Sequence, residues 1–208
     1  MERQYHAITF QPVGEGAGFR RPIQPQPARV TLESPALEVM TDLARTSPAT
    51  IRPLAPIDAA NQFMIARGVR LLLVVDERET VLGVVTSTDV LGEKAMRIAM
   101  DRGMKRGELT VADIMTGTGL LEALAYSDVA AARVGHVLET LRKAGRQHVL
   151  VVDFDLVPPQ RLLEREVQRV MVRGILSLSQ LARQLGVPLQ SVGEVASSFS
   201  EIGSALSR

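Results

Sequence analysis

The chain has 208 residues, 46% of them apolar, which suffices for one compact domain or two small ones. Its 24 Lys and Arg residues balance 23 Asp and Glu residues, and the net charge of +1 argues against nucleic acid or an anionic membrane as the main partner. The absence of Cys excludes disulfides and cysteine zinc sites, and no pair of the three His residues has the spacing of metal ligands. With no Trp, 2 Tyr and 5 Phe, an aromatic platform for stacking bases is also disfavoured.

No segment has the pattern of a membrane span or a signal peptide. The longest apolar run, Leu71–Val75, is far shorter than the roughly 18 residues that a membrane span needs. Met1–Gln11 lacks the apolar stretch of a secretory signal. The sequence therefore predicts a cytoplasmic protein.

The first part of the chain is rich in Pro and Gly, which predicts a flexible lead segment. Its Gly14–Gly18 stretch has the glycine spacing of a phosphate loop. However, no strand pattern precedes the glycines and no Lys-Ser/Thr pair follows them, so a linker is favoured.

Three short motifs occur twice along the chain, in the same order, which predicts two structural repeats. The pairs are Val39–Thr41 with Ile114–Thr116, Leu71–Asp76 with His148–Asp153, and Gly83–Thr86 with Gly174–Ser177. The second repeat carries an insertion over residues 154–173, which predicts an enlarged loop or an extended hairpin.

The elements of the first repeat follow from its apolar pattern. Helical spacing predicts a helix over Asp58–Ala66, and Gly68 follows as its stop. The apolar run Leu71–Val75 predicts a buried strand, and Val81–Val85 predicts the strand that returns beside it. Thr86 is suited to cap the helix that comes next.

The second repeat predicts the same series. A helix is expected over Val134–Lys143, stopped by Gly145, and strands are expected over Val149–Val152 and Val170–Leu176. Ser177 is the corresponding helix cap. Each β-α-β-β-α unit is too small to close its own core, so an α/β (α+β) fold with the two units packed together is predicted.

These observations divide the chain into four parts. They are a lead segment over residues 1–33, a first repeat with a connecting helix over 34–107, a second repeat with its insertion over 108–187, and a helical tail over 188–208.

Over residues 34–187 the sequence resembles the cystathionine-β-synthase (CBS) domain family, in its tandem form known as a Bateman module. The resemblance rests on Asp113–Thr116, Thr50–Pro53, Gly68–Asp76 and Gly83–Asp89, in this arrangement and repetition. It implies two domains related by a pseudo-twofold axis, frequent dimerisation, and adenosine-containing ligands bound in clefts. It also implies regulation in place of catalysis. The proline often found in the first hairpin strand is missing.

The segment Gly83–Asp89 has a chemical rationale for ligand binding. Gly83 permits close approach of a ligand, and Thr86 caps a helix whose N-terminus suits a phosphate. The Asp89 carboxylate is an acceptor that could take both hydroxyl protons of a ribose. The alternative is that Thr86 and Asp89 are an ordinary capping pair.

The resemblance assigns the ribose to Thr86 and Asp89 and places adenine beside Thr50 and Ile51. Arg70 is the nearest candidate for phosphate charge. No metal or required cofactor is predicted.

The second repeat has Ser177 and Gln180 where the first has Thr86 and Asp89. A neutral Gln has a single acceptor oxygen and cannot hold a ribose diol as a carboxylate does. We therefore expect one competent nucleotide site for each chain, and a degenerate second one.

Several other patterns compete with this interpretation. Gln180–Val192 resembles a helix-turn-helix, but Val187–Ser207 contains no Lys or Arg to neutralise phosphates. The apolar face of Val192–Leu206 fits either docking on the chain's own core or contact with a partner.

The Met96, Met100 and Met104 stripe fits core packing better than a binding surface. His148 is interpreted as a hydrogen-bonded structural residue.

The sequence contains no catalytic residue pattern and thus predicts no enzyme activity. It predicts a homodimeric regulatory module that binds AMP, ADP, ATP or a ligand similar to S-adenosylmethionine and signals to a protein partner by a change of conformation. A structural dimerisation module without ligand is the alternative, and a DNA-binding protein is a weaker one.

Overall fold

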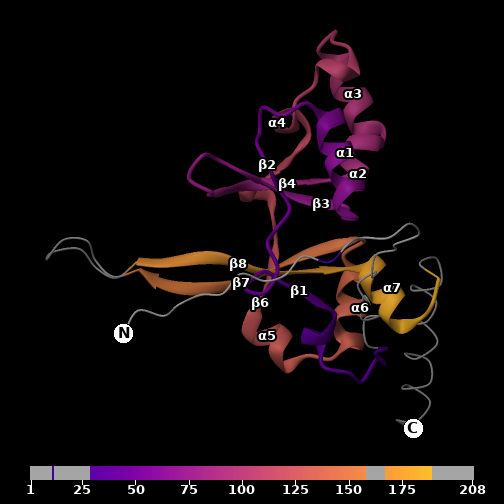
Figure 1. Ribbon diagram of the computed structural model, residues 1–208, viewed down its shortest axis with the longest axis vertical. Coiled ribbons are helices and arrows are strands. Elements are labelled where there is room, and N and C mark those ends of the chain that lie inside the picture. Colours follow the sequence, from indigo (N-terminus) through magenta and orange to yellow (C-terminus); the bar gives the residue numbers. More distant parts are fainter. Residues whose placement is uncertain (1–10, 12–28, 158–166, 189–208) are drawn as a thin grey trace, which may run out of the picture.

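The computed structural model describes Gln11 and residues 29–157 and 167–188, and in this part the chain forms two four-stranded sheets. The sheets lie one above the other along the long axis, each with its own helices (Figure 1). The α+β class expected from the sequence is confirmed.

The first sheet has the order β2-β3-β4-β5. Its strands are β2 (Thr50–Ile51), β3 (Leu71–Val75), β4 (Val81–Thr86) and β5 (Thr116–Gly117). The β2–β3 pair is parallel and the other two pairs are antiparallel. All five β3 side chains are buried, as expected for a strand covered on both faces.

The second sheet has the order β1-β8-β7-β6 and repeats the same pairing pattern. Its strands are β1 (Met40–Asp42), β6 (Ala123–Ala125), β7 (His148–Val157) and β8 (Val167–Ser177).

Each repeat places its first strand in the sheet of the other repeat. Strand β1 pairs with β8, with Met40 opposite Leu176, and β5 pairs with β4, with Thr116 opposite Val84. The repeated motif that begins at Val39 and at Ile114 marks these two exchanged strands. The β-α-β-β-α unit expected from the sequence lacked them, because two or three residues show no period from which a strand is recognised.

The two helices whose bounds the sequence predicted, Asp58–Ala66 and Val134–Lys143, are confirmed within one residue at each end. The helices of the first unit are α1 (Ile57–Arg67), α2 (Ser87–Leu91), α3 (Glu93–Asp101) and α4 (Val111–Ile114). The helices of the second unit are α5 (Tyr126–Ala131), α6 (Val134–Lys143) and α7 (Leu178–Leu185). Short 3₁₀ turns are η1 (Ala36–Val39), η2 (Arg106–Glu108) and η3 (Thr118–Leu120). Gly68 ends α1 at φ +64°, and Thr86 and Ser177 cap α2 and α7 as expected.

A separate apolar cluster joins the two units. Leu71, Leu73 and Val84 of the first sheet are buried together with Leu150 of the second. Ile175 of β8 packs against the same cluster. The two sheets therefore share a seam of apolar contacts in addition to the exchanged strands.

The insertion of the second repeat extends the β7–β8 hairpin, as the sequence predicted. The hairpin projects beyond the rest of the unit (Figure 1), with Phe154 opposite Val170. Both of these side chains are exposed. Three parts of the chain lie outside the described residues: the end of the insertion, most of the lead segment, and the tail. The predicted apolar face and the second helix of the helix-turn-helix pattern belong to this tail.

None of the helices within the described ranges is long and apolar enough to cross a membrane.

Gly83 is required where β4 meets the exchanged strand β5. A Cβ atom at this position would lie inside the contact distance of the Thr116 carbonyl oxygen and 3.0 Å from the Thr116 carbonyl carbon. We expect Gly83→Ala to lower the free energy of unfolding by about 2 kcal/mol or more, because the backbone of β5 must move away. Urea unfolding followed by circular dichroism measures this loss.

Gly119→Ala is the matched control, because a Cβ atom there would meet no atom within 4 Å. Its free energy of unfolding should stay within about 0.5 kcal/mol of the unchanged protein or rise slightly. Equal stability of the two variants would show that the exchanged strand β5 does not pack as described.

Candidate functional site

Two clefts lie at the junction of the two units. We name the larger the arginine cleft, a cavity of about 960 Å³. The smaller, of about 420 Å³, is the threonine cleft. Both take residues from both repeats, so a ligand in either cleft would contact both halves of the molecule.

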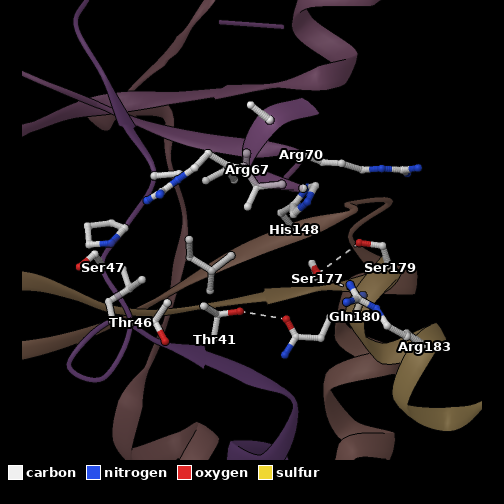
Figure 2. Close-up of a pocket in the computed structure, with 18 residues that line it drawn as sticks. Thr41, Thr46, Ser47, Arg67, Arg70, His148, Ser177, Ser179, Gln180 and Arg183 are labelled. Atoms are coloured by element: carbon white, nitrogen blue, oxygen red, sulfur yellow. Dashed lines mark hydrogen bonds between the residues drawn. The ribbon is translucent and has the colours of Figure 1, made fainter. Parts of the chain in front are cut away.

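The arginine cleft is lined by cationic and hydroxyl side chains (Figure 2). Its polar residues are Thr41, Thr46, Ser47, Arg67, Arg70, His148, Ser177, Ser179, Gln180 and Arg183. No Asp or Glu of the described part of the chain lines it. Uncompensated positive charge at a concave surface attracts anions.

The two predicted residues of the degenerate site, Ser177 and Gln180, lie in the arginine cleft. The Thr41 hydroxyl donates a 2.9 Å hydrogen bond to the Gln180 Oε1 atom, and the Gln180 backbone N–H donates to Ser177 Oγ at 3.3 Å. Since Thr41 belongs to β1, these bonds tie the first repeat's exchanged strand to the start of α7. The single acceptor of the Gln180 side chain already has a donor.

The threonine cleft lies beside the start of α2. It is lined by Thr86, Thr88 and Thr116 on the side of the first sheet and by the Gly145–Leu150 stretch of the second repeat. Its cation is Arg146, which forms an exposed ion pair with Glu122, another residue that lines the cleft. Ion pairs of this exposed kind are weak and are easily exchanged for a ligand.

Asp89 and Thr86 form a capping box at the start of α2. The Thr86 backbone N–H and hydroxyl donate to Asp89 Oδ2 at 2.9 and 2.7 Å, and Lys94 donates to Asp89 Oδ1 at 2.7 Å. The capping arrangement weighed as the alternative is therefore present. The Asp89 side chain is only 15% exposed and has a donor on each oxygen.

The structure divides the six predicted nucleotide-binding residues. Thr86 lines the threonine cleft, whereas Arg70 lines the arginine cleft. Thr50 and Ile51 pair with β3, and neither they nor Gly83 lines either of these two clefts. Asp89 also lines neither cleft, but its carboxylate is bonded to Thr86, which lines the threonine cleft. The sequence did not identify Arg67 and Arg183 as site residues, because isolated arginines on helices have no pattern that separates them from solvated ones.

His148 lies between the two clefts and lines both, as does Leu71, its counterpart in the first repeat. Its ring nitrogens form no hydrogen bond with a described residue, so the expected hydrogen-bonded environment is not found. Burial, together with the Arg70 charge, lowers the pKa of His148 to about 4. The imidazole is therefore neutral at pH 7.

In the described ranges no group of three His, Cys, Asp or Glu side chains could hold a metal ion.

The depressed pKa of His148 makes stability depend on pH. Between pH 6.5 and 4 the unfolded chain binds a proton at His148 and the folded chain does not, so the free energy of unfolding falls as the pH falls. The slope approaches about 1.4 kcal/mol for each pH unit in this window. We expect His148→Gln to remove this contribution, and urea unfolding at pH 7, 6 and 5 measures it.

His136→Gln is the control, since His136 lies on α6 and lines neither cleft. It should leave the contribution of His148 to the pH dependence in place. If the His148→Gln and His136→Gln variants lost stability equally as the pH falls, His148 would not be neutral in the folded state.

Comparison with known proteins gives a family match for part of the chain. The model of the CBS domain family matches residues 38–95. The comparison with curated proteins found no match.

Three solved structures illustrate the structural likenesses. An uncharacterized conserved protein from Pyrococcus horikoshii is 21% identical, with 73% of this chain and 92% of that chain covered and a TM-score of 0.48. CBSX2 in complex with AMP is 18% identical, with 72% and 94% covered and a TM-score of 0.45. The CBS domain pair of protein MJ0100, in complex with 5′-methylthioadenosine and S-adenosyl-L-methionine, is 22% identical, with 71% and 97% covered and a TM-score of 0.44.

Proposed function

We propose that the two repeats form a regulatory module of the CBS domain family that binds an adenosine nucleotide, and the match of the CBS domain model to residues 38–95 supports this. The observation that carries the proposal is the threonine cleft, whose walls come from both repeats. A cavity of about 420 Å³ falls within the size range of small-molecule sites, roughly 300 to 1,000 Å³. A regulatory role without catalysis and a cytoplasmic location are parts of this proposal.

In this proposal the ribose lies beside Thr86 and Asp89. The ribose hydroxyls would replace Lys94 as donors to the Asp89 carboxylate, and the Lys94 side chain is exposed enough to move away. Arg146 takes the place of Arg70 as the residue that meets the phosphate, because Arg70 lines the other cleft. The proposal leaves Thr50, Ile51 and Gly83 with structural roles in the sheet.

Signalling follows from the position of the cleft. A ligand that contacts both repeats can shift the module between two arrangements only by the difference in its affinity for them. The exchanged strands β1 and β5 connect the repeats, so a change in one sheet is passed to the other through backbone hydrogen bonds.

Calorimetric titration of the full chain with AMP, ADP, ATP and S-adenosylmethionine tests the nucleotide site. We expect Asp89→Ala to weaken nucleotide binding at the threonine cleft at least tenfold, because hydrogen bonds to a charged acceptor contribute about 1.5–3 kcal/mol. Asp113→Ala is the matched control. Thr110 caps α4 with Asp113 through the same pair of hydrogen bonds. Thr110 lines neither cleft, whereas Thr86, which is bonded to Asp89 in the same way, lines the threonine cleft.

The control separates a lost ligand contact from a lost helix cap. Both variants should lose a similar amount of stability, but only Asp89→Ala should lose nucleotide affinity. Unchanged nucleotide binding in Asp89→Ala would exclude the proposed site.

A homodimer is the second part of the proposal. Helix α3 presents Met96 and Met100, which lie one turn apart and are 52% and 76% exposed, and Leu91 at the end of α2 is 65% exposed. The expectation that the methionine stripe packs into the core is therefore wrong for Met96 and Met100. Exposed apolar patches of this kind on soluble proteins mark contact surfaces, and we propose that a second copy of the chain covers this one.

Paired substitution of Met96→Lys and Met100→Lys should convert the dimer to a monomer, because two buried charges without partners oppose association. Light scattering measures the mass. Val170→Lys on the projecting hairpin, where Val170 is 58% exposed, is the control and should leave the mass unchanged. A dimer that survives the paired substitution would place the contact elsewhere.

A further inference from the structure

We propose that the arginine cleft binds a ligand with several linked phosphate groups and recognises it by its charge, without need of a nucleoside. This site is separate from the nucleotide site proposed above. The inference rests on which side chains surround the cavity, on the arginines' lack of ion pairs with described residues, and on the missing acceptor for a ribose. Arg67 does contact an aromatic ring, that of Phe63, with 5.7 Å from its guanidinium carbon to the ring centroid.

The three arginines of the cleft come from different elements. Arg67 is the last residue of α1, Arg70 precedes β3, and Arg183 lies on α7. Figure 2 shows Arg67 and Arg70 above the cavity, with side chains that extend in opposite directions, and Arg183 below it. None of the three forms an ion pair with a residue of the described ranges. Like charges around one cavity repel each other, and an anion between them removes this cost.

Guanidinium groups suit phosphate in particular. Each can donate two parallel hydrogen bonds to a phosphate, and these charge-assisted bonds are shorter and stronger than neutral ones. A single phosphate fills only a small part of a cavity of about 960 Å³. A chain of two or three phosphates is longer and offers more acceptors, so it can meet more than one of the three arginines.

Hydroxyl groups add uncharged donors between the arginines. Ser177 and Ser179 lie 3.4 Å apart through their Oγ atoms at the start of α7, and Thr46 and Ser47 lie in the loop that follows β1. Figure 2 shows all four around the cavity. A ligand whose outer atoms are all acceptors finds donors on each side.

The same cleft offers little to a ribose. A ribose diol donates two hydrogen bonds and is best held by a carboxylate, but no Asp or Glu of the described part lines the cavity. The Gln180 Oε1 atom already accepts from the Thr41 hydroxyl at 2.9 Å. S-adenosylmethionine, whose sulfonium is cationic, meets like charge here. We infer that the nucleoside part of a ligand adds little at this site.

Calorimetric titration of the full chain with inorganic triphosphate, pyrophosphate, orthophosphate, adenosine and ATP tests this assignment. Affinity should rise at least tenfold from orthophosphate to triphosphate, and adenosine should not compete with triphosphate. In the Asp89→Ala variant, ATP and triphosphate should bind within about threefold of each other. Binding of ATP at least tenfold tighter than triphosphate in that variant would show that the nucleoside is recognised and would overturn the proposal.

The variant that removes the site is the Arg67→Gln and Arg183→Gln pair, which keeps side-chain length and hydrogen-bonding capacity. We expect it to weaken triphosphate binding at least tenfold and to leave nucleotide binding at the threonine cleft unchanged. Arg78→Gln, an exposed arginine that lines neither cleft, is the control. Triphosphate affinity that is equal in the paired variant and in the unchanged protein would contradict the proposal.

The nucleotide site at the threonine cleft and the polyphosphate site at the arginine cleft can be disproved independently of each other. Loss of AMP binding in Asp89→Ala with triphosphate binding retained supports both sites. Triphosphate binding that disappears in Asp89→Ala and persists in the arginine pair would place the polyphosphate in the threonine cleft.

Discussion

The exchange of the first strand between the repeats is the constraint on which the rest of the structure depends. A hairpin with two flanking helices cannot cover both faces of its own sheet, and here each sheet is completed by a strand from the other repeat. Backbone hydrogen bonds then cross the junction at β1–β8 and at β5–β4. Because these bonds would be broken by separation, the two repeats form one folding unit although each has its own apolar core.

Both clefts are a consequence of this exchange. The chain must return from β1 to β2 and from β5 to β6, and each return crosses the seam beside the apolar cluster. Thr46–Ala49 on the first return line the arginine cleft, and Leu120–Glu122 on the second line the threonine cleft. The first return is held at its start by Asp42, which accepts from the Ala44 N–H at 2.9 Å and pairs with Arg173. The packing that closes the fold therefore also forms the walls of the two clefts.

The sequence predicted the local elements well because they depend on local patterns. Helix α6, strand β3 and the caps Thr86 and Ser177 were placed by apolar period and by side-chain chemistry. The division of the site residues between two clefts could not be predicted. Arg70 directly precedes β3 and Thr86 ends β4 opposite Leu71, so the two residues lie at the same end of the hairpin. Only the packing of the second repeat decides which cleft each side chain enters.

Leu71 and His148 occupy equivalent positions of the two repeats and both line both clefts. A substitution at such a shared position alters both clefts at once and cannot specialise one of them. The two clefts can therefore differ in chemistry only at other positions, as where Gln180, which lines the arginine cleft, corresponds to Asp89, whose partner Thr86 lines the threonine cleft. Two sites with different chemistry can arise in this way from one symmetric frame while the central contacts that hold the repeats together are kept.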